Sequence, residues 1–188
     1  MLDVTQTKLP DVLLLEPRRF ADNRGHFSET WNRKRMAEQG LEYDFVQDNQ
    51  SLSMTAGTVR GLHFQTPPHA QTKLVRCTRG ALYDVAVDVR RGSPTYGQWV
   101  GYELSAANGL QLLIPAGFLH GFATLKDETE ICYKCDDYYA PECEGSIRFD
   151  DPDLAIDWGL GAVDPVLSDK DLVAGLLKNF DTPFIYEG

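Results

Sequence analysis

Two histidines of this sequence, His63 and His120, lie in patterned runs where their chemistry could be used. His63 lies in the strand-like run 57–64, and His120 closes the run 109–120, which has the form G-x5-P-x-G-x2-H. A histidine with an ordinary pKa of about 6.5 takes up and returns protons near neutral pH. The Pro-Gly turn before His120 predicts a returning strand that directs this side chain into an enclosed interior. We therefore favour a pocket position for His120 over the alternative of a buried structural histidine.

The histidines do not suffice for a transition-metal site. The chain has four of them, His26, His63, His69 and His120, and His63 and His120 alone fall short of a ligand set. A catalytic metal takes three or four nitrogen, oxygen or sulfur ligands from the protein and solvent. We therefore predict a site without a metal ion.

The four cysteines invite a zinc or disulfide interpretation, because Cys132 and Cys135 have the spacing C-x-x-C and Cys143 follows closely. The pair lies in a strand-like run, however, and residues three apart on a strand point to opposite faces. Together with Cys77, they are expected to be free thiols of a reducing cytoplasm.

The elements that must position these residues are mostly short strands. Apolar or alternating runs recur between turn signals such as Gly80, Gly92-Ser93-Pro94 and Asn108-Gly109, at 12–15, 45–49, 57–64, 73–77, 81–89, 98–104, 111–115, 121–125 and 130–135. Many short strands at this spacing predict an all-β sandwich or barrel. A helix is compatible with 31–39, and Ser168 with Asp171 three residues later forms a capping-box signature before the apolar residues 172–177.

Composition limits the partners. The 188 residues include 18 Lys and Arg against 28 Asp and Glu, a formal net charge of −10, with 43% hydrophobic and 24% charged residues. Such a chain is globular and binds neither nucleic acid nor an anionic membrane through overall charge. No basic segment followed by an apolar run opens the sequence, and no run is long enough to span a membrane. We expect one cytoplasmic domain, 1–188, with an N-terminal arm over about 1–45.

Several ordered motifs carry a family resemblance. They are F-x-D-x-R-G-x-F-x-E at 20–29, followed by the runs 47–51, 59–65, 73–77, 84–88 and 97–100. Together, over about residues 2–175, they are similar to the dTDP-4-dehydrorhamnose 3,5-epimerase family, and the run 109–120 resembles a signature of cupin barrels. The resemblance implies a cupin-type double-stranded β-helix (jelly-roll) barrel with a few short peripheral helices, one of them C-terminal. It also implies a homodimer that works without a metal or organic cofactor.

The family reaction assigns four catalytic residues by resemblance. The 4-ketone of dTDP-4-dehydro-6-deoxy-D-glucose acidifies the hydrogens at C3 and C5, and their inversion through enolates gives dTDP-4-dehydro-L-rhamnose. His63 matches the base and Asp171 its carboxylate partner, Tyr133 the acid on the opposite face, and Lys73 the cation beside the C4 oxygen. From local sequence alone, Asp171 is instead a helix-capping carboxylate, and we expect one side chain not to fill both roles easily.

The resemblance also implies the substrate contacts. One tyrosine of Tyr138 and Tyr139 should stack on thymine, with Tyr139 preferred. The other matched positions are Arg24, Glu29, Gln47, Asp48, Asn49, Arg60, His120, Glu144 and Lys170. Four cations, Arg24, Arg60, Lys73 and Lys170, should gather at one barrel mouth around the diphosphate. Arg24 and Glu29 precede the barrel, so the arm is in a position to complete the partner subunit's site.

Three alternatives remain open at this point. The chain could epimerise only C3 or only C5 of a related dTDP-keto-sugar, bind sugars without catalysis, or be a metal-dependent cupin oxygenase or isomerase. The presence of Tyr133 favours the double epimerase.

Overall fold

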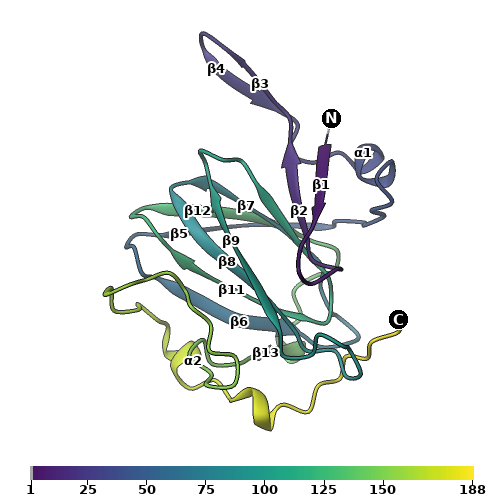
Figure 1. Ribbon diagram of the computed structural model, residues 1–188, viewed down its shortest axis with the longest axis vertical. Coiled ribbons are helices and arrows are strands. Elements are labelled where there is room, and N and C mark those ends of the chain that lie inside the picture. Colours follow the sequence, from purple (N-terminus) through teal and green to yellow (C-terminus); the bar gives the residue numbers. More distant parts are fainter. Residues whose placement is uncertain (1) are drawn as a thin grey trace.

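The computed structural model describes residues 2–188 and consists mainly of strands in two facing antiparallel sheets (Figure 1). One sheet has the order β1-β2-β10-β7-β12-β5 and the other β13-β6-β11-β8-β9, while β3 and β4 form a separate hairpin. The elements are β1 (Leu2–Gln6), β2 (Leu13–Pro17), β3 (Arg19–Asp22), β4 (Gly25–Ser28), α1 (Arg33–Ala37), β5 (Gln47–Ser53), β6 (Val59–Gln65), β7 (Lys73–Arg79), β8 (Ala81–Asp88), β9 (Trp99–Ser105), β10 (Gln111–Ile114), β11 (Phe118–Thr124), β12 (Thr129–Cys135), the 3-10 turn Pro141–Cys143, β13 (Glu144–Ser146), α2 (Asp169–Leu172) and the 3-10 turn Leu177–Asn179. The strand spacing predicted a sandwich or barrel, and the family resemblance implied a jelly roll. The two facing sheets confirm both expectations.

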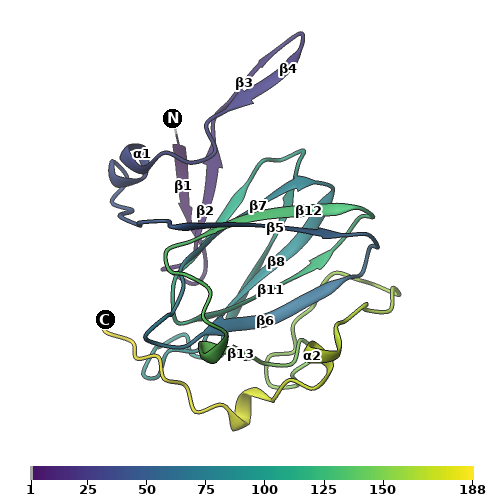
Figure 2. The same ribbon diagram turned by 180° about the vertical axis from the view of Figure 1, so that it is seen from behind.

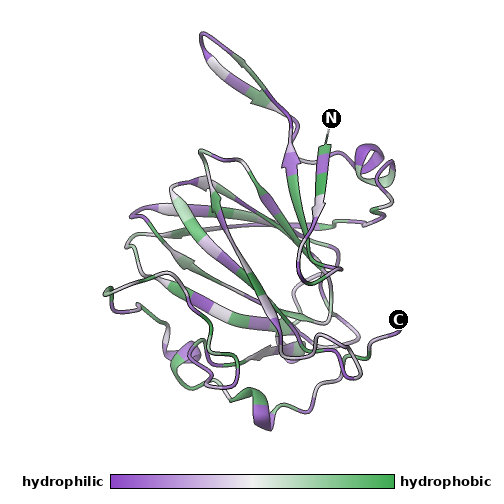
Figure 3. Cartoon of the chain, in the orientation of Figure 1, coloured by the Kyte–Doolittle hydropathy of each residue, from purple (hydrophilic) through white to green (hydrophobic). Residues whose placement is uncertain are grey.

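The principal core lies between the two sheets. Leu82 and Ala86 of β8 pack there against Val75 of β7, Leu112 of β10 and Ile131 of β12. Apolar segments run along the strands of both sheets (Figure 3). Because side chains alternate along a strand, the same inner faces also carry the polar residues that fall in step with these positions.

A second core covers the outer face of the five-stranded sheet. The segment that follows β13 lays Leu154, Trp158, Leu177 and Phe184 on Val85 and its neighbours. As a result β11 is buried along its whole length, which explains its continuous apolar run. This C-terminal covering segment, residues 147–188, carries α2 along the edge of the sheet (Figures 1 and 2).

Only part of the expected N-terminal arm projects from the barrel. β1 and β2 join the edge of the six-stranded sheet, with β2 pairing to β10. The β3–β4 hairpin extends away from both sheets (Figures 1 and 2) and exposes Phe20 and Phe27. The chain that follows the hairpin packs Trp31 and Met36 against the outer face of the six-stranded sheet. Within residues 2–188, no helix is long and apolar enough to cross a membrane.

The two helices are shorter than their sequence patterns suggest. α1 begins after Asn32, whose side chain accepts a hydrogen bond from the Arg35 backbone N–H. α2 has the predicted N-cap Ser168 but ends at Leu172, without continuing through the apolar residues 172–177. The reason is a competing backbone partner, since Gly175 bridges to Ile147 and accepts a hydrogen bond from the Arg148 N–H.

Gly61 and Gly121 let β6 and β11 approach closely beside the future site. Gly61 has a φ of +123°, and a Cβ there would lie 2.6 Å from the Gly121 Cα. The contact falls where the pairing register shifts, just beyond the directly opposed pair His63 and His120. The close approach therefore fixes the two histidines side by side on one inner face.

Candidate active site

His63 and Asp171 form a hydrogen-bonded pair between β6 and α2. The His63 Nε2 lies 2.6 Å from the Asp171 Oδ1, and the carboxylate side chain is only 3% exposed. The other carboxylate oxygen accepts a hydrogen bond of 2.8 Å from the Ser168 hydroxyl. The two residues are 108 positions apart in the chain, so only the covering segment brings them together.

Capping and pairing fall to different side chains, so they do not compete for the Asp171 carboxylate. The Ser168 hydroxyl accepts a hydrogen bond from the Asp171 backbone N–H and at the same time donates to the Asp171 carboxylate. The helix is therefore capped by Ser168, while the Asp171 side chain keeps one oxygen for His63. The capping signature positions the carboxylate instead of consuming it.

The electrostatic setting makes His63 a neutral base. Burial lowers its pKa, and the hydrogen bond and charge of Asp171 oppose that change without cancelling it. At neutral pH the imidazole is therefore unprotonated and ready to accept a proton. A carboxylate in this position can hold the ring and would stabilise an imidazolium formed there.

Tyr133 lies on β12, in the facing sheet, directly across from Asn49 of β5. Its neighbour Lys134 points to the outer face, where the ammonium lies over the Trp31 ring and 3.2 Å from Asp48. Burial raises the pKa of Tyr133, so the phenol keeps its proton at neutral pH. It is thus equipped to act as an acid.

Lys73 begins β7 and faces the same interior. Burial lowers its pKa, and the charges of Cys135, Asp84 and Glu144 act in the opposite direction. Within residues 2–188, its ammonium makes no ion pair or side-chain hydrogen bond, and only burial and charges at longer range act on it. It is a cation held ready for an incoming anionic oxygen.

Two adjoining cavities meet at these residues. The larger, about 510 Å³, and the smaller, about 280 Å³, share His63, Lys73 and Tyr133 in their linings. The larger is also lined by Ser51, Thr58, Val59, Arg60, His120, Phe122, Ile131, Val166, Leu167, Ser168, Lys170 and Asp171. The smaller adds Gln47, Asn49, Phe64, Gln65, Gln71, Tyr139 and Glu144. A ligand that fills both would have its middle beside the three shared side chains.

His120 is buried in the wall of the larger cavity. Its Nε2 lies 2.8 Å from the Oδ1 of Asp84, a carboxylate that the sequence reasoning did not single out. The pocket position predicted for His120 is thus combined with a buried polar pairing.

A polar chain borders the smaller cavity. The Tyr139 hydroxyl donates a 2.9 Å hydrogen bond to Glu144, whose other oxygen pairs with the Lys170 ammonium. Burial alone would raise the pKa of Glu144, but the hydrogen bonds from Lys170 and Tyr139 outweigh it and lower the pKa. The covering segment is in this way joined to β13 beside the cavity.

Four predicted contact residues lie elsewhere in the single chain. Arg24 pairs with Asp22 in the projecting hairpin, and Glu29 pairs with Arg35. Asp48 faces outward to Lys134, and Tyr138 is exposed, outside both cavity linings. The expectation that four cations gather at one mouth was therefore wrong for one chain. Arg60, Lys73 and Lys170 line one cavity, whereas Arg24 sits on the hairpin.

Sequence reasoning missed some lining residues that a simple signal could have found. Phe122 and Ile131 are two positions from His120 and Tyr133, so strand alternation places them on the same inner faces. Asp84 interrupts an apolar run, which marks an acid in a buried strand. Ser51 lies two positions beyond Asn49 on β5, so the same alternation places it on the face that carries Gln47 and Asn49.

The described residues contain neither a cluster of metal ligands nor a disulfide. Within residues 2–188, no three His, Cys, Asp or Glu side chains come together as metal ligands. All four cysteines are free thiols, including the pair in the C-x-x-C run.

Fold and site together define a jelly-roll protein built for proton transfer next to a carbonyl group. A buried base with its carboxylate, a protonated phenol and an ammonium surround one point of an internal cavity. Such a set can remove a proton from carbon, stabilise the enolate and return a proton.

Comparison with known proteins agrees with this class. The sequence profile of the dTDP-4-dehydrorhamnose 3,5-epimerase family matches residues 6–179. A dTDP-4-dehydrorhamnose 3,5-epimerase of Sinorhizobium fredii is 56% identical over 182 residues, which cover 95% of this chain and 91% of the relative. The Legionella pneumophila dTDP-6-deoxy-D-glucose-3,5-epimerase, solved with dTDP-4-keto-L-rhamnose, has a TM-score of 0.95 and 45% identity and covers 100% of both chains. The Bacillus anthracis enzyme, solved with TDP and PPi, has a TM-score of 0.91 and 50% identity, covering 94% of this chain and 100% of that one.

This chain belongs to the dTDP-4-dehydrorhamnose 3,5-epimerase family. It is a cupin-type jelly-roll isomerase, as the sequence motifs predicted.

Proposed function

We propose that this enzyme inverts both C3 and C5 of dTDP-4-dehydro-6-deoxy-D-glucose at the junction of the two cavities. The observation that carries the proposal is the shared lining of His63, Lys73 and Tyr133. A base and an acid on opposite sheets suit a reaction in which a proton leaves one face of the sugar and returns to the other.

Proton removal is the task of His63. Its neutral imidazole takes the proton from the carbon next to the C4 carbonyl, and the Asp171 carboxylate stabilises the resulting imidazolium. The electron pair of the broken C–H bond moves into the carbonyl and leaves an enolate oxygen at C4. Lys73 stabilises that oxygen by charge and hydrogen bonding.

Inversion is completed by Tyr133. Its phenol donates a proton to the carbon from the face opposite His63, and proton exchange with solvent restores both groups. The same cycle at the second centre requires the substrate to turn or pucker so that the other carbon faces the pair.

The nucleotide is assigned to the polar walls around the junction. Arg60 and Lys170 suit the diphosphate, and Gln47, Asn49, His120 and Glu144 suit hydroxyl and base contacts. Tyr139 lines the smaller cavity and remains the choice for stacking on thymine. The bound dTDP-sugar and TDP of the Legionella and Bacillus structures support a ligand of this class.

The active unit is proposed to be a homodimer of single-domain chains, 1–188, in the cytoplasm. In one chain, Arg24 and Glu29 lie away from the cavities, while Phe20 and Phe27 of the same hairpin are exposed. An exposed aromatic hairpin that also carries a contact arginine fits a partner's site better than solvent. Four free cysteines fit a reducing compartment.

The test is turnover in heavy water. Incubation with dTDP-4-dehydro-6-deoxy-D-glucose should place deuterium at both C3 and C5, as read by NMR and mass spectrometry. Incorporation at one centre would make the enzyme a mono-epimerase, an outcome to which a 42% identical dTDP-4-dehydrorhamnose 3-epimerase of Streptomyces niveus gives some weight. Binding without incorporation would leave a sugar-binding protein and refute the proposal.

A further inference from the structure

Asp84 is a buried acid for which the proton-transfer steps above have no use. It lies on β8 and is 0% exposed, with Leu82 and Ala86 of the same strand packing in the core between the sheets. Because side chains alternate, Asp84 faces that interior too. Burying a carboxylate costs free energy unless partners compensate it, so its retention beside the cavity calls for a reason.

Among the described residues, only one of the two carboxylate oxygens of Asp84 has a hydrogen-bond partner. Its Oδ1 lies 2.8 Å from the His120 Nε2, which places the imidazole at the wall of the larger cavity. Its Oδ2 is buried and has no hydrogen-bond partner within residues 2–188. The free oxygen leaves negative charge available to the cavity.

The cation that this charge can serve is Lys73. Lys73 begins β7 in the facing sheet. Val75, two residues further along that strand and on the same face, packs in the same inner core as Leu82 of β8. Burial lowers the pKa of Lys73, and the charges of Cys135, Asp84 and Glu144 raise it. The thiol of Cys135 has its pKa raised to about 11 by burial, so it is uncharged near neutral pH. Glu144 is committed to Lys170 and Tyr139.

Asp84 is therefore the acidic neighbour with an unused oxygen. The titratable or charged groups around Lys73 are His63 of β6, Asp84 of β8, His120 of β11, Tyr133 and Cys135 of β12, Glu144 of β13, and Arg60, Lys170 and Asp171 around the larger cavity. The cations among these groups, Arg60 and Lys170, disfavour the protonated form of Lys73. A buried negative charge acts against that effect and favours protonation of Lys73.

We propose that Asp84 is a positioning residue that orients His120 through one oxygen and keeps Lys73 cationic through its buried negative charge. This inference rests on the proposed function, because Lys73 matters as the cation that receives the enolate. A purely structural role, in which Asp84 only ties β8 to β11, makes different predictions.

The direct test is the Asp84→Asn variant, which keeps the size and a hydrogen-bonding group but removes the charge. The pKa of Lys73, followed by NMR of the labelled lysine side chain, should fall by about 1 unit. The alkaline limb of the kcat profile should move down by the same amount. A variant with an unchanged Lys73 titration and an unchanged alkaline limb would overturn the proposal.

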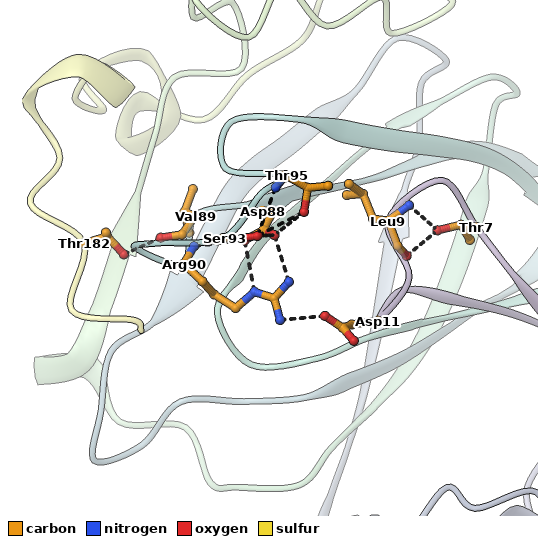
Figure 4. A network of polar contacts seen from close by, with 9 residues as sticks. All are labelled: Thr7, Leu9, Asp11, Asp88, Val89, Arg90, Ser93, Thr95 and Thr182. Atoms are coloured by element: carbon orange, nitrogen blue, oxygen red, sulfur yellow. Dashed lines mark hydrogen bonds and ion pairs between the residues drawn. The ribbon is translucent and has the colours of Figure 1, made fainter. Parts of the chain in front are cut away.

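Asp88→Asn is the matched control. Asp88 lies on the same strand and is also 0% exposed, but its carboxylate is held by Arg90, Ser93 and Thr95, with Arg90 reaching on to Asp11 (Figure 4). Its substitution should lower stability and leave the alkaline limb in place. If the control shifted that limb as far as Asp84→Asn does, the charge assignment would be wrong.

Two features keep the test decisive. If Asp84→Asn does not fold, the double variant Asp84→Asn/His120→Asn replaces the pair with two neutral amides and is compared with His120→Asn alone. Lys73 should titrate lower in the double variant, and equal values would refute the role. The NMR titration needs no turnover, so it separates failure of this inference from failure of the proposed reaction, in which the wild-type enzyme would give no deuterium incorporation.

Discussion

At the scale of single residues, burial and neighbouring charges divide the base and acid roles between His63 and Tyr133. His63 and Tyr133 are both buried, yet burial makes one a neutral base and the other a protonated acid, because it disfavours the charged form of each. His63 was chosen for its residue type and the family match, and Tyr133 through the family match alone. The direction of each pKa shift could not be predicted from the sequence, since it depends on packing contributed by several strands.

Replacement of Asp171 tests the dyad. Asp171→Asn keeps the size of the side chain but removes the charge that stabilises the imidazolium, so kcat should fall roughly 10²- to 10⁴-fold. Because the carboxylate raises the pKa of His63, its loss should also move the acid limb of the kcat/KM profile to lower pH. An acid limb that moved upward would contradict the pairing. Asp169→Asn, on the same short helix, is the control and should retain activity.

The wild-type pH profile follows from the same shifts. His63 must be neutral to act, and burial lowers its pKa, so kcat/KM should rise with pH through a midpoint below 6.5. Lys73 must be protonated, and its pKa is lowered, so activity should decline at a pH below 10.5. Tyr133 has a raised pKa and should not limit the alkaline side first. Steady-state kinetics in buffers of constant ionic strength measures both limbs.

At the scale of elements, most strands of the two sheets were predictable, but β1, β3, β4, β13 and the contacts between distant segments were not. The apolar runs at 73–77, 81–89 and 130–135 correspond to β7, β8 and β12, because alternation and turn residues are local signals. The helix start at Ser168 was also local. Its early end was not, because Gly175 pairs with Ile147 in another part of the chain. The same long-range docking brings Asp171 to His63, which only the family resemblance anticipated.

The close approach of β6 and β11 yields a stability prediction. Gly61→Ala would place a Cβ 2.6 Å from the Gly121 Cα and 2.8 Å from the His120 carbonyl oxygen, at a φ of +123°. Because the backbone of one strand must move, the free energy of unfolding should fall by about 1–3 kcal/mol. Activity should also fall, because the movement displaces His63 and His120. Chemical denaturation measures the first effect.

Gly25→Ala provides the matched control for this substitution. Gly25 has a similar φ of +133° but no heavy atom within 4 Å of an added Cβ. It should therefore show only the smaller cost of backbone strain. Equal losses in the two variants would mean that the strand contact is not tight.

At the scale of the whole molecule, the net charge of −10 describes the surface and not the site. Arg60, Lys73 and Lys170 line one cavity in spite of the acidic excess, and local cations of this kind can attract an anionic ligand against the overall field. Arg24 lies outside this set in one chain. The proposed dimer would return it to the site of a partner subunit.

Subunit mixing tests that arrangement. Arg24→Ala removes the hairpin's cation and His63→Ala removes the base, so each homodimer should be strongly impaired. If hairpins cross between subunits, a mixed dimer has one intact site, and random reassociation should restore on the order of a quarter of wild-type activity. If each hairpin serves its own chain, mixing restores nothing and the crossed arrangement is refuted.

The central claim is that His63 removes the proton and Tyr133 returns one to the opposite face. The most direct measurement compares deuterium wash-in to recovered substrate with product formation for His63→Ala and Tyr133→Phe in heavy water. His63→Ala should abolish both processes. Tyr133→Phe should retain exchange while losing most inversion, because the base remains and the acid is gone. Equal loss of exchange and inversion in Tyr133→Phe would contradict the acid role and with it the division of labour proposed for this site.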